Sequence, residues 1–257
     1  MIMERDIIID HALDKARQCR DKYVITNTSF LDMSERSAVD AALKKSGTRY
    51  VFFGGYEDAE RTVCVFLPDY VDDIEMFFSE DPSSCPIGIL RSTYAAGAPA
   101  PSHRDYLGSL TGLGIKREKL GDIVVYDGGA DIIFLKEIEK FLLKEYNSAG
   151  RVRLDVASVP LNDLHKPEFK IKTERGSVAS MRLDNLISEI FSLSREKSAE
   201  AIDGGIVFVD GVKVIKTDAK VNVGSKLVLR GQGKAIVKEI AGNTRSGRTA
   251  VIYDKYL

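Results

Sequence analysis

Apolar residues between positions 183 and 203 recur every three or four residues, which is the spacing of amphipathic helices. Ser194 divides this stretch in two, and a serine in that place caps a helix by accepting an orphan backbone N–H. The second run stops at Gly204-Gly205, where a residue without Cβ can take the left-handed conformation that closes a helix. The pattern therefore predicts two short helices. Their apolar positions are Leu183, Leu186, Ile187, Ile190, Phe191 and Leu193 in the first and Ala199 and Ile202 in the second.

Short apolar stretches after Gly205 predict strands. Residues 206–209 and 212–215 flank Asp210-Gly211, a dipeptide that is typical of tight hairpin turns. Residues 227–229 continue the strand pattern after Gly224. We therefore expect two helices and a small twisted sheet in this part of the chain.

Between residues 49 and 155 the pattern alternates between strand-like and helical stretches. Residues 50–53 and 62–67 predict a hairpin with a longer polar loop, GGYEDAER. A helix is expected to begin after Ser102 and to end at Gly114, and another to pass through 138–146. Strands interleaved with helices predict an α/β layer with its helices on one face of a sheet. The other expected strands are 87–91, 123–125, 132–134 and 152–156.

The chain is thus expected to have an α+β fold in four regions. The first 47 residues contain two helical patterns and form a helical N-terminal segment. The α/β middle domain follows over residues 48–158, and a charged, proline-containing linker over 159–175. Residues 176–257 form the C-terminal domain.

Composition narrows the class of protein. Of the 257 residues, 44% are hydrophobic and 29% are charged, as in ordinary globular domains. The N-terminus contains acidic residues and no long apolar core, which is unlike a secretory signal, and no apolar run is long enough to span a membrane. The three cysteines match neither a zinc site nor a disulfide framework, so we expect reduced thiols and a cytoplasmic protein that needs no cofactor or metal.

Charge is distributed unevenly along the chain. Residues 176–257 contain thirteen Lys and Arg against nine Asp and Glu, a balance of +4, whereas the whole chain carries −1. A basic module on a mildly acidic body is the pattern that phosphate-backbone binding produces. A solvated surface without a partner explains the same balance, so charge alone leaves both interpretations open.

The order of residues from Arg182 to Lys234 favours RNA. It runs RLD, SR-x-K-x-A-x-x-I-x-x-G-x-V-x-V-D-G, K, V-x-x-G-S and RG-x-GK, and it resembles the S-four (alpha-L) RNA-binding domain. This helix–helix–hairpin module occurs in a ribosomal protein, tyrosyl-tRNA synthetases and pseudouridine synthases, and it binds structured RNA. Relatives usually have Asn where this chain has Asp210, and both residues suit a turn. With Lys216 added for its charge, the resemblance implies RNA contacts at Arg182, Ser194, Arg195, Lys197, Lys213, Lys216, Arg230 and Lys234.

A second resemblance covers nearly the whole chain. The segment SHRDYLGSLTGLGIKREKLGDIVV, with GGYEDAER upstream and the RNA module downstream, is similar to the YlmH family of bacterial proteins. The resemblance implies a ribosome-associated RNA-binding protein with no established catalytic role. It also implies a link to the large ribosomal subunit and tRNA in the rescue of stalled translation, and genes near cell-division loci.

The middle domain offers a second candidate RNA surface. A helix start is favourable for phosphate because its backbone N–H groups are free, and arginine can contact phosphate through two donors. The alternative is that Asp105 lies near the helix dipole at an ordinary helix start and Arg104 pairs with a carboxylate. The residues of this second surface are Ser102, His103 and Arg104 at the helix start, and Lys116, Arg117 and Lys119 one loop further on.

Two other functions remain open. Asp184 stands in an RLD sequence like that of pseudouridine synthases, but the Thr-Ser-Gly that follows in those enzymes is missing here. An RNA-modifying activity could instead lie in residues 49–155, where a cluster of titratable groups in a deep pocket would support it. Alternatively, this region is a platform for protein partners.

Overall fold

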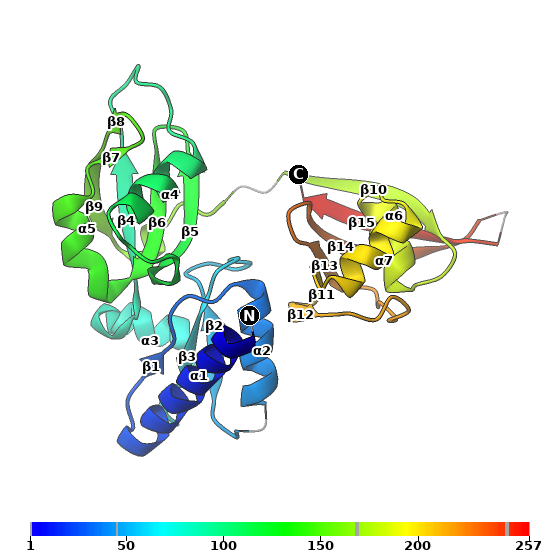
Figure 1. Cartoon of the computed structure of the whole chain (residues 1–257), viewed down its shortest axis with the longest axis horizontal. Coiled ribbons are helices and arrows are strands. Elements are labelled where there is room, and N and C mark those ends of the chain that lie inside the picture. The colour runs from blue at the N-terminus through cyan, green and yellow to red at the C-terminus, as the bar shows by residue number, and fades with distance from the viewer. Residues whose placement is uncertain (1, 45, 168–169, 245–246, 257) are drawn as a thin grey trace. The chain divides into compact units, whose positions relative to one another are not determined.

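The computed structural model describes residues 2–44, 46–167, 170–244 and 247–256. The chain divides into two compact units, Met1–Pro167 and Glu168–Leu257 (Figure 1). Both units combine helices with antiparallel sheets, so the predicted α+β class is confirmed. No helix within the described residues combines the length and the apolar character needed to cross a bilayer.

Unit 1 begins with two helices on a three-stranded sheet. Strand order is β1-β3-β2, and β2 and β3 form the predicted hairpin, with Tyr50 opposite Phe66. Both helices pack on the face of β3 that presents Cys64 and Phe66, because alternate residues of a strand point to opposite faces. The elements are α1 (Ile2–Lys22), β1 (Thr26–Asn27), α2 (Met33–Leu43), β2 (Tyr50–Phe53) and β3 (Val63–Phe66).

A four-stranded sheet with the order β5-β6-β4-β9 forms the second layer of unit 1. Helices α4 and α5 cover one face through Tyr106, Leu110 and Leu142, as predicted. The opposite face packs against the first sheet through Ile89 and Val65. The elements are α3 (Ile74–Glu80), β4 (Ile87–Thr93), α4 (His103–Gly112), β5 (Leu120–Tyr126), β6 (Gly129–Leu135), α5 (Glu139–Glu145), β7 (Ser148–Ala149), β8 (Val152–Arg153) and β9 (Asp155–Val159).

A network of hydrogen bonds around the buried Asp122 connects the two sheets of unit 1. Asp122 accepts hydrogen bonds from the Tyr56 hydroxyl at 2.7 Å and from the backbone N–H groups of Glu60 and Arg61. The Arg61 guanidinium donates to the carbonyls of Phe30 and Leu120 at 3.1 and 3.0 Å. Residues 1–47 and 48–158, which were expected to be separate regions, therefore share one core. The sequence pattern does not show this because strand partners are not encoded locally.

Unit 2 is a six-stranded sheet covered by two helices. Strand order is β10-β15-β14-β13-β11-β12, and α6 and α7 bury Leu186, Ile187 and Ile202 against it. Both predicted helices are present, with Ser194 as the cap of α7 and Gly205 in the left-handed region after it. The elements are β10 (Ile171–Val178), α6 (Leu183–Ile190), α7 (Arg195–Asp203), β11 (Val207–Val209), β12 (Val212–Lys213), β13 (Lys226–Leu229), β14 (Gly233–Asn243) and β15 (Thr249–Tyr256).

The linker was expected to span residues 159–175, but in the structure folded elements occupy both ends of this range. Residues 161–163 form a short 3₁₀ turn in unit 1, and β10 begins at Ile171 and pairs with β15 from Ile171–Tyr256 to Val178–Thr249. Strand β10 is charged and mostly exposed, so its apolar pattern is weak and its partner lies about eighty residues away along the chain. The segment between the docked turn and β10 is accordingly short.

Candidate nucleic-acid interface

The start of α6 is held by the loop between β12 and β13. The backbone N–H groups of Leu183 and Asp184 donate to the carbonyls of Ala219 and Thr217 at 2.8 and 3.0 Å. Arg182 forms an isolated antiparallel bridge with Lys220. These amides are therefore occupied by backbone carbonyls and are not free for phosphate. The loop nevertheless places the Lys220 backbone directly beside Arg182.

Arg182 itself is paired within its own helix. Its guanidinium donates to both carboxylate oxygens of Asp184, at 3.1 and 2.7 Å. About half of the Arg182 side chain is exposed, so it remains accessible to solvent. Asp184 lies in the first turn of α6 and its carboxylate is engaged, which is the arrangement of a helix-surface ion pair.

The start of α7 has the features that α6 lacks. Ser194 accepts a hydrogen bond from the Lys197 N–H at 3.2 Å and so caps the helix. Within the described residues, the N–H groups of Arg195 and Glu196 have no hydrogen-bond partner. The side chains of Arg195 and Lys197 are exposed. Unpaired amides at the positive end of the helix dipole, flanked by two cations, form an anion-binding arrangement.

Lys213 lies at the opposite end of α7. A Cβ built on Gly205 would come within 2.1 Å of the Lys213 Cε, so the lysine stem crosses the glycine directly. Gly205 has a φ of +67° and ends the helix, and a cation is favourable beside the exposed carbonyls at this end. Lys213 therefore contributes to the fold at the C-terminal end of α7, away from Arg195.

The remaining predicted cations of unit 2 lie around its hairpins. Arg230 is exposed in the turn between β13 and β14, and Lys216 is exposed in the loop after β12. The ammonium of Lys234 lies 4.6 Å from the centre of the Tyr256 ring, a cation–π contact that holds it on the sheet. Arg230 and Lys234 therefore belong to the β13–β14 hairpin and Lys216 to a separate loop.

Asp210 has a role that the sequence did not reveal. Asp210 and Gly211 both have positive φ, as in the tight hairpin turns that match strand twist. The Asp210 carboxylate accepts hydrogen bonds from the Ser225 hydroxyl at 3.0 Å and the Lys226 N–H at 2.7 Å. A turn residue with an acceptor on its side chain thus connects two hairpins of unit 2.

At the start of α4 in unit 1, Ser102 and Asp105 form a capping box. The Ser102 hydroxyl donates to the Asp105 carboxylate at 2.6 Å, and the Ser102 N–H donates to it at 2.8 Å. These bonds hold the pKa of Asp105 below its usual range. His103 and Arg104 are exposed beside the cap. The predicted helix start is confirmed, with Ser102 and Asp105 engaged in capping.

The three cations after α4 differ in their environment. Arg117 is partly buried and donates to the carbonyls of Leu120 and Gly121 at 3.0 and 2.9 Å, and burial lowers its pKa to about 10. Lys119 pairs with Glu137 at 2.5 Å, whereas 78% of the Lys116 side chain is exposed. Arg117 therefore contributes contacts to the fold, whereas Lys116 is the most exposed of the three cations.

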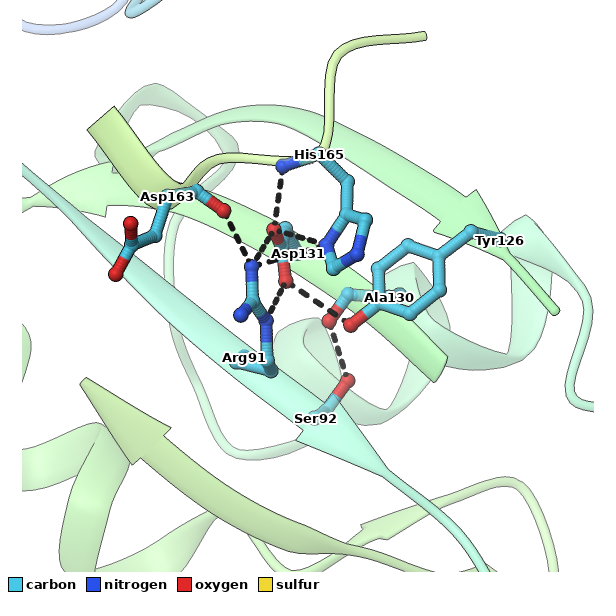
Figure 2. Close-up of polar contacts among 7 residues, drawn as sticks. All are labelled: Arg91, Ser92, Tyr126, Ala130, Asp131, Asp163 and His165. Carbon is cyan, nitrogen blue, oxygen red and sulfur yellow. Dashed lines mark hydrogen bonds and ion pairs between the residues drawn. The ribbon is translucent and has the colours of Figure 1, made fainter. Parts of the chain in front are cut away.

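A polar cluster around the buried Asp131, which was not predicted from the sequence, lies in the second sheet (Figure 2). Asp131 is fully buried and accepts hydrogen bonds from Arg91 on β4, Tyr126 on β5 and His165 after β9. The His165 ring stacks on Tyr126 with centroids 3.8 Å apart. Both oxygens of Asp131 are occupied, so this carboxylate is a structural hub and is not free to act as a general base. Arg91 and Asp131 are the single charged residues of mostly apolar strand sequences, and this isolation was the signal in the sequence that could have indicated their pairing.

Comparison with known proteins agrees with the family resemblance. Residues 87–163 match the family model described as a putative RNA-binding domain in YlmH. The ribosome-associated protein quality control protein P2 of Bacillus subtilis (strain 168) is 28% identical over 247 residues, covering 96% of this chain and 93% of the relative. A solved structure, the cell division protein ylmH from Streptococcus pneumoniae, is similar with a TM-score of 0.49 and 20% identity over 63% of this chain and 95% of that chain.

The match in the central domain and the similarity along nearly the whole chain thus confirm that this protein resembles the YlmH family and contains a YlmH-type domain at residues 87–163.

Proposed function

We propose that this chain is a non-catalytic RNA-binding protein that binds ribosomal RNA or tRNA on the large ribosomal subunit and acts in the quality control of stalled ribosomes. Two similarities to known proteins support this role. The central domain matches a family of putative RNA-binding domains, and the relative from Bacillus subtilis is named for ribosome-associated quality control. Unit 2, with its S-four-like order of residues, is the principal RNA-binding part.

The start of α7 is the observation that carries the proposal. Two backbone N–H groups without partners among the described residues lie between the exposed cations Arg195 and Lys197. A phosphate placed there would accept from the amides and pair with both side chains, and it would release counterions from the RNA. No comparable arrangement exists at the start of α6, where the loop carbonyls occupy the amides.

Arg182, Lys216, Lys220 and Arg230 extend the proposed surface over unit 2. All four are exposed, and Arg182 forms a backbone bridge with Lys220. Contacts from several separated cations suit a folded RNA whose phosphates are also separated. Exposed His103, Arg104 and Lys116 of unit 1 provide the second, weaker site. Because only residues 166–170 separate the docked His165 from β10, binding at one site raises the effective concentration of the other.

The salt dependence of RNA binding tests this proposal. Affinity for tRNA and for a large-subunit ribosomal RNA fragment is measured across salt concentrations, with wild type and with Arg195→Ala plus Lys197→Ala. The variant should bind more weakly, and the slope of log affinity against log salt should fall by about one to two, since each phosphate contact contributes roughly 0.7 to 0.9. The control, Lys140→Ala plus Lys144→Ala on exposed positions of α5, should retain the wild-type affinity and the wild-type slope. Weaker binding with an unchanged slope would contradict phosphate contact at α7.

The alternative function is an RNA-modifying activity like that of pseudouridine synthases. Asp184, its candidate nucleophile, is bonded to Arg182 through both oxygens, and the buried Asp131 has its oxygens occupied. We therefore expect Asp184→Asn to leave RNA binding and ribosome association unchanged. Detection of uridine modification that the substitution abolishes would favour the enzyme.

A further inference from the structure

A strongly acidic segment connects β3 to α3 and continues into the 3₁₀ turn Pro82–Ser84. Residues 69–81 contain six carboxylates and no Lys or Arg, a formal charge of −6 in a chain whose total is −1. This is the reverse of the balance in unit 2, and the RNA proposal does not require it. The acids are Asp69, Asp72, Asp73, Glu75, Glu80 and Asp81.

Buried side chains and a buttressing arginine hold this segment in place. Val71 and Phe78 are 1% and 4% exposed, and the Phe78 ring packs on Phe53 with centroids 5.5 Å apart. The Arg49 guanidinium donates to the carbonyls of Asp69 and Val71 at 3.3 and 2.9 Å. The backbone of the segment is therefore fixed before any partner arrives, and little conformational entropy remains to be lost on binding.

Large apolar side chains project from the same region into solvent. Tyr70 and Met76 are 60% and 62% exposed, and Tyr23 at the end of α1 is 66% exposed. The Tyr70 hydroxyl donates to the Tyr23 carbonyl at 3.3 Å, and the Tyr70 ring lies 6.3 Å from that of Phe77. Gathered apolar side chains within a polar rim are the usual anatomy of a protein-binding surface, and exposed tyrosine and methionine are common in such surfaces.

We propose that this acidic aromatic surface, formed by residues 69–81 together with Tyr23, docks a protein segment that is rich in Lys or Arg and carries an apolar or aromatic side chain. The sign of the charge selects the partner, because six carboxylates attract a basic segment and repel the phosphates of RNA. The exposed tyrosines offer ring faces to its cations. Met76, which is unbranched and adaptable, can pack against its apolar side chain.

This inference goes beyond RNA binding and uses none of the cations assigned to it. It gives unit 1 a separate role, in which this unit contacts a basic protein while unit 2 binds RNA. The two roles can therefore be lost independently, and substitutions in one surface should leave the other intact.

The test uses the full-length protein and fluorescent peptides of about 12 residues that repeat Lys-Lys-Phe, Lys-Lys-Ser or Glu-Glu-Phe, with binding followed by anisotropy at low salt. Wild type should bind the Lys-Lys-Phe peptide best and the Glu-Glu-Phe peptide not at all. Asp72→Lys plus Glu80→Lys should weaken binding roughly tenfold or more. This pair spares Asp73 and Asp81, which cap α3 and the following turn. Asp72 lies 3.8 Å from the Arg49 guanidinium, but its side chain is 97% exposed, and such an exposed ion pair contributes little to stability, so folding should persist.

Two further variants separate the apolar contribution from general attraction. Tyr70→Ser plus Met76→Ser should reduce the preference for Lys-Lys-Phe over Lys-Lys-Ser by roughly fivefold, since it removes apolar contact and leaves the charge. Glu145→Lys plus Asp155→Lys makes the same charge change at exposed positions elsewhere in unit 1 and should retain binding.

Four outcomes would overturn the proposal. These are no binding by wild type, equal weakening in the Glu145 and Asp155 control, equal affinity for the Phe and Ser peptides, or retained binding in the Asp72 and Glu80 variant. Loss of RNA binding in that variant would assign the surface to RNA instead. A dimer in sedimentation that Tyr70→Ser plus Met76→Ser dissociates would assign it to a second copy of the chain.

Discussion

Arg91 and Asp131 form a two-point ion pair between directly opposite positions of β4 and β6. The Arg91 Nε and Nη2 atoms lie 2.9 and 2.8 Å from the two carboxylate oxygens of Asp131. The carboxylate has no exposed surface, while a quarter of the Arg91 side chain is exposed. The Arg91 guanidinium also donates to the Asp163 carbonyl at 2.6 Å, so the pair holds the last turn of unit 1 to the sheet.

Asp131→Asn should therefore destabilise unit 1. Removing one partner of a buried ion pair leaves the other uncompensated, which costs about 3 kcal/mol of the free energy of unfolding. Denaturant unfolding of wild type and variant measures the difference. Asp163→Asn is the matched control, because Asp163 contributes only its backbone carbonyl and its side chain is exposed. Equal loss in both variants would show that the ion pair is not the cause.

The same carboxylate should make stability dependent on pH. Burial raises the pKa of Asp131, but the bonds from Arg91 and His165 outweigh burial and leave the pKa below its usual range. A carboxyl whose pKa is depressed on folding contributes stability that is present above its unfolded value of about 3.9 and is lost as pH falls through the folded value. The difference in unfolding free energy between wild type and Asp131→Asn should accordingly shrink below about pH 4. A difference that stays constant down to pH 2 would contradict this linkage.

His165 should control the accessibility of the segment that leads to unit 2. Its N–H and Nδ1 lie 2.9 and 3.0 Å from one oxygen of Asp131, and its ring stacks on Tyr126. His165→Ala keeps the backbone hydrogen bond but removes the side-chain hydrogen bond and the ring stacking. This loss should lower the free energy of local opening by about 1 kcal/mol, so opening should become roughly fivefold more frequent. Limited proteolysis with subtilisin measures cleavage between residues 160 and 167. Asn162→Ala, an exposed position on the same turn, should cleave at the wild-type rate; faster cleavage there too would remove the special role of His165.

Substitutions of Arg117 and Lys116 should distinguish a cation that stabilises the fold from one that is exposed on the surface. Arg117→Ala removes two hydrogen bonds from a charged donor to the carbonyls of Leu120 and Gly121, and it should lower the free energy of unfolding by about 2 kcal/mol. Lys116→Ala should leave stability unchanged. If RNA contacts exist here, Lys116→Ala should weaken RNA binding modestly. Loss of RNA binding without loss of stability in Arg117→Ala would restore Arg117 to the RNA surface.

Local signals in the sequence predicted local structure well. Ser102 and Ser194 were expected to cap helices, and both do so. Asp210-Gly211 was expected to form a hairpin turn, and both residues have the positive φ that this turn needs. Each of these signals depends on residues within one helical turn or one hairpin, so no knowledge of distant partners is required.

Long-range pairing could not be predicted in the same way. The first five residues of β10, 171–175, were assigned to the linker because the alternation of this strand is weak and its partner, β15, follows about eighty residues later. The occupied amides of Leu183 and Asp184 depend on a loop more than thirty residues away. The ion pair of Arg91 and Asp131 depends on strand register. In each case the physical cause is a contact between segments that are remote in the sequence.

Co-sedimentation with ribosomal subunits tests the central claim most directly. Wild type, Arg195→Ala plus Lys197→Ala, and the control Lys140→Ala plus Lys144→Ala are each mixed with purified subunits and separated on gradients. We predict that wild type and control travel with the large subunit and that the α7 variant, folded by circular dichroism, does not. Equal association of all three, or no association of wild type with any subunit, would contradict the account.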